Sequence, residues 1–422
     1  MEHTRPMVSF LHSADWQIGK PYARVVDPDK RARLRQARLE VIERLGPLAR
    51  SSEAAFLLVA GDLFDSPTPG ASDVTAVCFA LGRLGLPVLV IPGNHDHGAP
   101  GSLWHSAFFQ AERQLRAPNV QVLLEPTPVV LEQAVVLPCP LLRRQHSEDP
   151  SAWLHHLDWN HLPPELPRIV LAHGSTSSFG AIDLEADDEN PLTANNLLRL
   201  DESLLAAIDF VALGDWHGLK QVSPKVWYAG CPEQDRFPRA SDYRSGQVLA
   251  VAVERGGAAS VTVQPTGQLG WHQLRFRFDG DGDLDRFEQH LLGLLGDRVG
   301  QELLLLDVEG QLSLQGQRRY ALLLERLEAQ LLRLKRRGRI ETMPEDQELA
   351  ALTQRPGDPL IARVAAALQQ RLSGRPTASG PGTAGDPAGQ VETGVSGADR
   401  FEPEVVGLAL GELHRLVQAG GS

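Results

Sequence analysis

The sequence predicts an α/β fold whose functional side chains follow the strands. In the first half of the chain, apolar runs of strand length alternate with segments of helical periodicity. Five apolar runs end in Asp, Asn or His, and α/β proteins bind ligands outside the carboxyl ends of parallel strands. We therefore expect one site, assembled from loops that lie far apart in the sequence.

The first apolar run, MVSFLHSADWQ, predicts a buried strand that ends at Asp15 and Gln17. Residues 29–50 follow with apolar side chains at helical spacing, which predicts a helix. The polar positions of this helix carry several arginines, and charged residues on a surface helix commonly face solvent. We expect solvent exposure for Arg31, Arg33, Arg35 and Arg38.

The next two strands are predicted from AAFLLVAGDLFDS and LPVLVIPGNHDHG, with a helix at residues 72–84 between them. The first run ends at Asp62 and Asp65, and the second at Asn94 and His95. Asn and Asp also form turns, so one such motif alone is weak evidence for a site. The recurrence of the pattern at successive strand ends favours a shared chemical role.

The middle of the chain adds further strands. Three short β-rich runs lie in residues 120–142, and we expect them to pair antiparallel. RIVLAHGS predicts a buried strand that ends at His173, and FVALGDWHG predicts one that ends at Asp215 and His217. Residues two apart in an extended segment project to the same side, so this last pair can reach one site. GQVLAVAVE and ASVTVQP predict a closing hairpin.

The character of the sequence changes near residue 265, so residues 1–265 are expected to form the catalytic domain. A strand, a helix at residues 283–295 and a second strand predict a small domain at residues 266–315. A long helix is expected at residues 318–337, followed by another near residues 359–372. The remaining boundaries are a helical region at 316–372, a Gly-, Ser- and Pro-rich linker at 373–399 and a terminal helix at 400–422.

Length and composition exclude several classes of protein. A chain of 422 residues is too long for a single ordinary core. It contains no uncharged apolar run of roughly 20 residues and no apolar N-terminal signal segment, so we expect a cytoplasmic location. Three scattered cysteines predict neither a disulfide framework nor a thiolate zinc site. The formal net charge of −12 argues against general coating of polyanions.

The collected side chains are carboxylates, amides and imidazoles, which suit divalent ions such as manganese or iron. Two such ions about 4 Å apart can clamp a phosphate and activate a water molecule. Asp62 is the candidate bridge between them. The candidate metal ligands are Asp15, Gln17, Asp62, Asn94, His173, Asp215 and His217, and the candidate catalytic residues are His95 and Asp65.

The motifs HSADWQIG, VAGDLFDS, IPGNHDHG, AHGS and LGDWHG resemble those of the calcineurin-like metallophosphoesterases, and are most similar to the SbcD-type DNA-repair nucleases. The resemblance implies a β-sandwich flanked by helices in four α/β/β/α layers, a small α+β capping domain and a helical tail. It implies that His95 protonates the leaving oxygen or steadies the transition state. The family's metal ligands correspond to Asp15, Asp62, Asn94, His173 and His217.

The resemblance also implies a DNA exo- or endonuclease with two divalent ions, Mn²⁺ or alternatively Fe²⁺ or Mg²⁺. Its expected partners are DNA, a second copy of the chain and an SMC-like ATPase of the SbcC type, working in DNA repair. The chain departs from the family pattern at Gln17 and Asp215, where these nucleases usually carry histidines. Two alternatives therefore stay open: a phosphatase or cyclic-nucleotide phosphodiesterase, and a weakly active subunit that mainly binds DNA or a partner.

Overall fold

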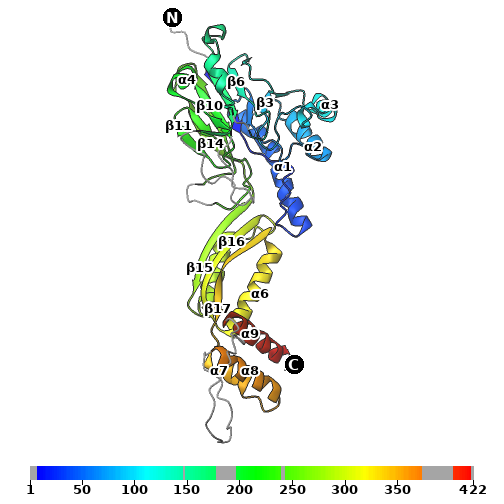
Figure 1. Ribbon diagram of the computed structural model, residues 1–422, viewed down its shortest axis with the longest axis vertical. Coiled ribbons are helices and arrows are strands. Elements are labelled where there is room, and N and C mark those ends of the chain that lie inside the picture. The colour runs from blue at the N-terminus through cyan, green and yellow to red at the C-terminus, as the bar shows by residue number, and fades with distance from the viewer. Residues whose placement is uncertain (1–6, 146–147, 177–195, 239–242, 373–402, 420–422) are drawn as a thin grey trace, which may run out of the picture. The chain divides into compact units, whose positions relative to one another are not determined.

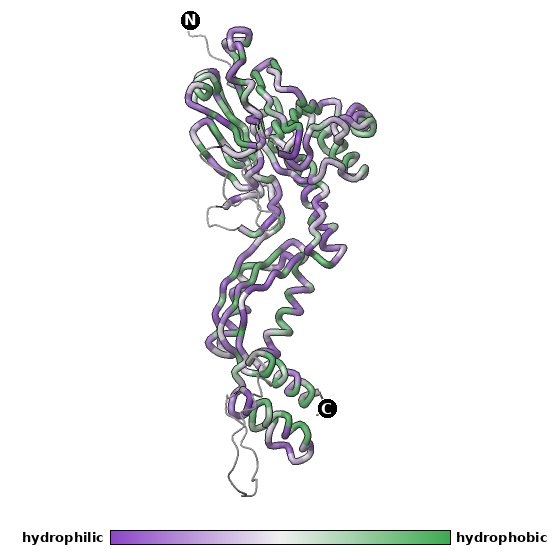
Figure 2. Tube along the Cα trace, in the orientation of Figure 1, coloured by the Kyte–Doolittle hydropathy of each residue, from purple (hydrophilic) through white to green (hydrophobic). Residues whose placement is uncertain are grey.

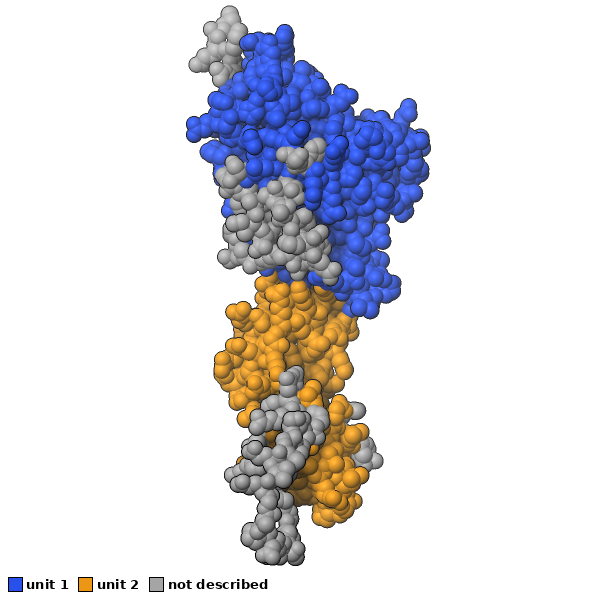
Figure 3. All heavy atoms as spheres, in the orientation of Figure 1, with its two compact units in different colours: residues 1–271 blue, residues 272–422 orange. Residues whose placement is uncertain are grey.

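The computed structural model describes residues 7–145, 148–176, 196–238, 243–372 and 403–419. The chain divides into two compact units, residues 1–271 and 272–422 (Figure 3). This division lies close to the boundary predicted after residue 265. The predicted linker, residues 373–399, lies outside the described residues.

The first unit contains two six-stranded sheets (Figure 1). In the first sheet, four strands run parallel in the order β1-β2-β3-β4, and the predicted hairpin of β13 and β14 pairs antiparallel beside β1. Three helices pack their apolar side chains on its outer face. The elements are β1 (Met7–Ser13), β2 (Leu57–Ala60), β3 (Val88–Ile91), β4 (Val120–Val122), β13 (Gln247–Glu254), β14 (Ser260–Pro265), α1 (Pro28–Ser51), α2 (Ala71–Gly82) and α3 (Ala107–Arg116).

The second sheet has the order β11-β12-β10-β7-β6-β5, and its central strands β12, β10, β7 and β6 are parallel. A short helix and two 3-10 turns cover its outer face. A separate two-stranded sheet, β8 and β9, lies between β7 and β10 in the sequence. These elements are β5 (Val129–Val130), β6 (Val135–Cys139), β7 (Arg168–His173), β8 (Ser175–Thr176), β9 (Leu197–Leu198), β10 (Phe210–Gly214), β11 (Lys220–Ser223), β12 (Val226–Tyr228) and α4 (Glu202–Ala207).

The antiparallel prediction for residues 120–142 is confirmed for the second and third runs, which pair with each other, and is wrong for the first. β4 pairs parallel to β3 and β6 parallel to β7, and only β5 and β6 pair antiparallel. A short apolar run indicates that a strand is buried, but it does not indicate which strand it pairs with. Here the fully buried strands β3 and β7 supply the neighbours, and both faces of each sheet are covered.

A core between the two sheets holds them face to face. Phe10 of β1 stacks on Phe56 at a ring distance of 5.2 Å and meets the edge of Phe210 from β10 at 5.6 Å. Alternate residues of the same strands point outward, so Leu11 packs among the helices instead. The predicted four-layer arrangement, with helices outside two packed sheets, is confirmed.

The second unit is built on a sheet of three strands, β15-β16-β17, in which β16 and β17 run parallel. Aromatic and leucine side chains pack helices α5 and α6 against one face of this sheet, among them Phe278, Leu304 and Leu324. The elements are β15 (Gly270–Phe278), α5 (Asp283–Leu295), β16 (Glu302–Leu312), α6 (Leu314–Gln330) and β17 (Arg333–Thr342). β15 and β16 precede the boundary that we predicted after residue 315, and β17 follows it, so one sheet contains strands from both sides of that boundary.

The helix predicted at residues 318–337 is wrong in its second half. α6 ends at Gln330, its C-cap Leu331 is extended, and residues 333–342 form β17 in parallel register with β16. No Gly or Pro interrupts the Leu- and Arg-rich segment, so no local signal marks the end of the helix. Pairing with β16, a partner distant in sequence, decides the structure of this segment.

The described part of the second unit holds three further helices: α7 (Asp346–Thr353), α8 (Pro359–Leu372) and α9 (Pro403–Ala419). The sequence predicted α8 and α9 but not α7. Leu352, Ala365 and Leu410 bury together where the three helices meet. Figure 2 shows that hydrophobic and hydrophilic residues are mixed along α8 and α9, as expected for amphipathic helices. Within the described part of the chain, no helix has the length and hydropathy needed to cross a membrane.

Candidate metal centre

Three aspartates follow strand ends in strained backbone conformations. Asp15 follows β1 with φ 55°, Asp62 follows β2 with φ 55°, and Asp215 follows β10 with φ 101°. Non-glycine residues in this region cost about 1 to 3 kcal/mol each, and such strain concentrates at functional sites. The turns direct the three carboxylates away from the ends of their strands into one shared space.

His173, the last residue of β7, lies at the centre of this space. Its Nδ1 donates to the carbonyl oxygen of Ala60 at 2.8 Å, which leaves Nε2 facing the carboxylates. Nε2 lies 3.7 Å from an oxygen of Asp62, 3.7 Å from one of Asp215 and 3.2 Å from Oδ1 of Asn94. Asp15 completes the group, since its ligand atom lies within 4.8 Å of those of Asp62 and His173. We call these five residues the His173 cluster: Asp15, Asp62, Asn94, His173 and Asp215.

Glycines make the close approach of these side chains possible. A Cβ atom at Gly93 would collide with the Asp62 carboxylate, and one at Gly61 would collide with the His173 ring. Gly214 is equally restricted, because its Cβ would meet the carbonyl oxygen of Ala60. The glycines of the Gly-Asp and Gly-Asn motifs are therefore steric requirements of the site.

Burial and mutual repulsion perturb the cluster electrostatically. Burial, together with the neighbouring Asp62 and Asp215, raises the pKa of Asp15 to about 8. Burial alone would lower the pKa of His173, but the surrounding carboxylates raise it to about 9. Three carboxylates, one amide oxygen and one imidazole form a donor set that fits a divalent ion such as Mn²⁺ or Fe²⁺.

Metal binding at the His173 cluster is expected to release protons. At pH 7, a carboxyl group with a pKa of about 8 and an imidazole with a pKa of about 9 are both protonated, and both must lose the proton to bind a metal. We expect protons to be released at pH 7 in a number that falls to none well above pH 9, and an affinity that rises between these values. Calorimetric titration with Mn²⁺ in buffers of different ionisation enthalpy measures this number. A buffer-independent enthalpy at pH 7 would contradict the assignment.

The two remaining candidate ligands, Gln17 and His217, belong to a separate hydrogen-bonded ring. Lys20 Nζ donates to Gln17 Oε1 at 2.7 Å and to Asp235 Oδ2 at 3.0 Å. His217 Nδ1 donates to the same Asp235 oxygen at 2.9 Å, and its Nε2 lies 3.4 Å from Gln17 Nε2. We call Gln17, Lys20, His217 and Asp235 the Lys20 ring.

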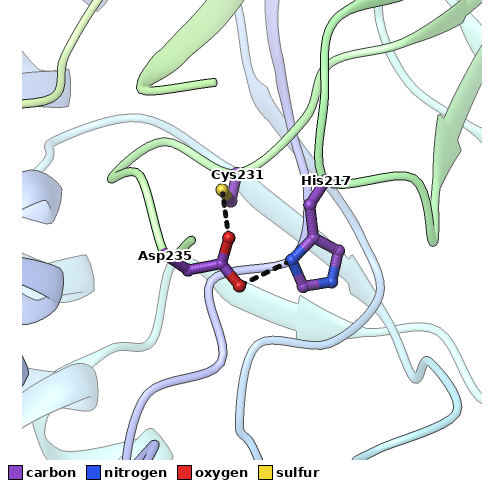
Figure 4. Close-up of side chains that lie close together, drawn as sticks. All are labelled: His217, Cys231 and Asp235. Carbon is purple, nitrogen blue, oxygen red and sulfur yellow. Dashed lines mark hydrogen bonds and ion pairs between the residues drawn. The ribbon is translucent and has the colours of Figure 1, made fainter. Parts of the chain in front are cut away.

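Asp235 is the anionic centre of this ring. Figure 4 shows its carboxylate between the His217 imidazole and the Cys231 thiol, which donates to it at 3.7 Å. Arg236 adds a further cation at 3.2 Å. Although burial opposes ionisation, Arg236, Lys20 and His217 hold the pKa of Asp235 well below its usual range. Burial lowers the pKa of His217 to about 4, so its ring is neutral.

His95 stands beside the cluster. Its backbone N–H donates to Asp62 Oδ1 at 2.9 Å, and its ring Nδ1 lies 3.1 Å from the carbonyl oxygen of Asp65. Asp96 accepts from the backbone N–H groups of Gly93 and Phe64 at 2.7 and 3.0 Å. It thereby ties the loop after β3 to the loop after β2 and orients both.

A family model places this geometry among known proteins. The model of the calcineurin-like phosphoesterases matches residues 8–242, more than half of the chain. The chain belongs to this family. Two solved structures also resemble it. The crystal structure of TT1561 of Thermus thermophilus shares 13% sequence identity, with 61% of this chain and 99% of that chain covered and a TM-score of 0.35. Another crystal structure shares 12% identity, with 62% and 99% covered and a TM-score of 0.36.

As a calcineurin-like phosphoesterase, the chain hydrolyses phosphoesters with divalent metal ions. The structure brings five of the seven predicted ligands together in the His173 cluster and places Gln17 and His217 in the Lys20 ring. The roles of individual residues as ligands or catalysts stay predictions. Their assembly at one edge, from strand ends far apart in sequence, follows the expected pattern.

Sequence reasoning missed three residues that shape the site. Arg38 was expected at the surface of α1, yet it is buried and donates to the carbonyl oxygens of Trp16 and Asp15 at 2.7 and 3.1 Å. Lys20 and Asp235 were assigned no role. Two signals were available: Lys20 follows Gly19 at the end of the first motif, and Asp235 lies in the Gly-Cys-Pro segment after β12.

Proposed function

We propose that this phosphoesterase is an SbcD-type DNA nuclease that hydrolyses phosphodiester bonds in DNA repair. The observation that carries the proposal is a cationic sheet face in the second unit. α5 and α6 cover one face of the sheet, and the side chains that alternate with the core residues form the other. We call this the basic sheet face: Arg275, Arg277, Asp307, Glu309, Arg333, Lys335, Arg337 and Arg339.

The basic sheet face is rich in positive charge, whereas the chain as a whole is acidic. Its six cations outnumber the three carboxylates at alternating positions of the same strands, Asp307, Glu309 and Glu341, although the chain carries a formal net charge of −12. Ion pairs join Arg275 to Asp307 at 3.1 Å and Arg277 to Glu309 at 3.6 Å, while Arg337 and Arg339 extend the face along exposed β17. Positive charge at strand spacing suits the phosphates of a nucleic acid backbone. A small-molecule phosphatase has no use for such a surface.

The catalytic contribution of the chain's own residues follows from the cluster. A divalent ion held there supplies positive charge that polarises a phosphate and activates water. The bond from Nδ1 to the carbonyl oxygen of Asp65 orients the His95 ring, and we assign to this ring the transfer of a proton to the leaving oxygen. The Asp62 carboxylate is fixed by the backbone of His95, which couples the position of the ligand to that of the acid.

A nuclease assay with Mn²⁺ tests the proposal. Linear DNA is compared with bis-p-nitrophenyl phosphate and with cyclic nucleotides, each with and without EDTA. Metal-dependent cleavage of DNA supports the nuclease. Hydrolysis of the small substrates alone would favour the phosphatase or cyclic-nucleotide phosphodiesterase, and DNA binding without any turnover would favour a binding subunit.

Loss of charge on the basic sheet face is expected to weaken DNA binding. Arg337→Ala combined with Arg339→Ala should raise the Kd for DNA about 10-fold at moderate salt and reduce its salt dependence, because two phosphate contacts are lost. Hydrolysis of bis-p-nitrophenyl phosphate should not change. The matched control is Arg318→Ala with Arg326→Ala on exposed positions of α6, which packs on the opposite face. Equal weakening by both pairs would contradict a binding role for this face.

We further propose an SMC-like ATPase as partner and a homodimer as the working state. Leu360 and Val364 lie one helical turn apart on α8 and are 72% and 40% exposed. Such an apolar stripe fits the coiled coil of the ATPase. Leu360→Asp with Val364→Asp should abolish binding of that coiled coil, whereas Arg363→Asp on the same helix should not. Sedimentation of the full chain tests the homodimer.

A further inference from the structure

The His173 cluster and the Lys20 ring differ in what the potential metal-ligand atoms of each group contact. In the His173 cluster, oxygens of Asp62, Asn94 and Asp215 converge on Nε2 of a single imidazole. Asp15, Asp62 and His173 are buried, so the cluster gathers three carboxyl groups around one imidazole at a place largely removed from solvent. A divalent ion would satisfy this arrangement directly.

In the Lys20 ring, the atoms that could ligate a metal are already engaged by neighbouring side chains. Gln17 would offer a metal its Oε1, but this atom accepts a hydrogen bond from the Lys20 ammonium at 2.7 Å. His217 would offer Nε2, since Nδ1 donates to Asp235, but Nε2 faces the Gln17 amide nitrogen at 3.4 Å. A metal ion in this place would have to displace both contacts.

Electrostatics oppose a second ion in the same place. The Lys20 ammonium carries a positive charge at the oxygen that a metal would need, and the Arg236 guanidinium lies 3.0 Å from His217 Nδ1. A divalent ion beside two cations is repelled by both. The negative charge of Asp235 is in turn engaged by Lys20 and Arg236 at 3.0 and 3.2 Å, so it does not attract a further cation strongly.

Local structure holds Lys20 in this position. Its backbone N–H donates to the carbonyl oxygen of Gln17 at 3.2 Å, which closes a tight turn. Gly19 within the turn has φ 93°, a conformation that favours glycine. The turn folds the Lys20 side chain back over Gln17, and the side chain is 24% exposed. The ammonium therefore has a fixed place at the edge of the site.

We propose that this chain binds one divalent ion tightly, in the His173 cluster, and that the ammonium of Lys20 takes the place of the second cation of a two-metal site. Lys20 then supplies fixed positive charge where a two-metal enzyme holds its second ion. Gln17 acts as its hydrogen-bond acceptor, which explains why an amide replaces the expected histidine. The proposal concerns metal content, so it stands or falls independently of whether DNA is the substrate.

Metal content and electron paramagnetic resonance of the full chain test this proposal. The protein is loaded with Mn²⁺, freed of excess ion by gel filtration and analysed by mass spectrometry of the metal. We expect about one ion per chain and the hyperfine spectrum of an isolated Mn²⁺. Two tightly held ions per chain with a spin-coupled spectrum in the unmodified protein would overturn the proposal.

A pair of variants tests the role of Lys20 without relying on turnover. Gln17→His combined with Lys20→Met restores a ligand and removes the ammonium, and should raise the content to about two ions per chain with a coupled spectrum. Lys20→Arg keeps the charge and should stay at one. A double variant that folds, as judged by its circular dichroism, and still binds only one ion would refute the exclusion of the second ion by Lys20.

Discussion

Replacing Asp62 with asparagine is expected to abolish tight metal binding and phosphoester hydrolysis. Asp62 lies 3.7 Å from His173 Nε2 and shares the cluster with Asp15, so we expect it to be a central ligand. Asparagine keeps an oxygen that can accept from the His95 N–H, and the loop should therefore retain its structure. What the substitution removes is the negative charge that attracts the ion.

The measurement is the melting temperature with and without Mn²⁺. A ligand present at 1,000 times its Kd stabilises the folded state by about 4 kcal/mol, and we expect this stabilisation in the unmodified protein. It should be lost in Asp62→Asn. A metal-induced shift of full size in the variant would exclude Asp62 from the ligands.

A second buried carboxylate supplies the control. Asp209 accepts hydrogen bonds from the backbone N–H groups of Arg168 and Gly256 and from Arg255, at 2.7 to 2.9 Å, and lies outside the cluster. Asp209→Asn weakens a satisfied network, so it should lower the melting temperature both with and without metal. The difference made by Mn²⁺ should persist. The two variants thus separate loss of a metal ligand from loss of a buried ion pair.

The strand-end residues could be predicted because the signal for them is local. In VAGDLFDS and IPGNHDHG, an apolar run marks a buried strand and the following glycine marks a turn, so the position of Asp62 or Asn94 follows from a few adjacent residues. Parallel pairing then brings strand ends together without further information. These two rules place Asp15, Asp62 and Asn94 at the strand ends of the first sheet and His173 and Asp215 at those of the second. The packing of the two sheets against each other then joins them in the His173 cluster.

The Lys20 ring could not be predicted in this way. Lys20 and Asp235 are 215 positions apart, and each lies several residues beyond the end of its strand. The burial of Arg38 depends equally on the loop after β1, which its guanidinium holds by main-chain contacts. Such contacts form only once the sheets have formed, so the local pattern of a single sequence does not predict them.

β17 illustrates the same limit at the level of secondary structure. Leu331, Leu332 and Leu334 continue the helical spacing of α6, and the arginines that follow suit a helix end. The segment pairs with β16 instead because its alternate residues place Leu334 and Ile340 against the core of the unit. The gain from burying a third strand outweighs a weak local preference for helix. The basic sheet face, and with it the support for DNA as substrate, was therefore invisible before the strand was seen.

Replacing His95 with glutamine is expected to lower kcat by about 100-fold to 10,000-fold while leaving metal content unchanged, because general acid catalysis contributes on this scale. His95 holds Asp62 through its backbone N–H, which glutamine supplies equally, so the variant keeps this contact with the cluster. Metal analysis and steady-state kinetics on bis-p-nitrophenyl phosphate measure the two effects separately. Loss of metal in proportion to activity would mean that His95 is a ligand.

The role of Asp65 is resolved by the same measurements. Its carbonyl oxygen positions the His95 ring at 3.1 Å, and this contact survives any change of the Asp65 side chain. Burial raises the pKa of its carboxyl, which suits proton transfer. If Asp65→Asn loses as much kcat as His95→Gln, the carboxylate takes part in the reaction, as the sequence suggested. If kcat stays near that of the unmodified protein, Asp65 acts through its main chain, and proton transfer to the leaving oxygen rests on His95.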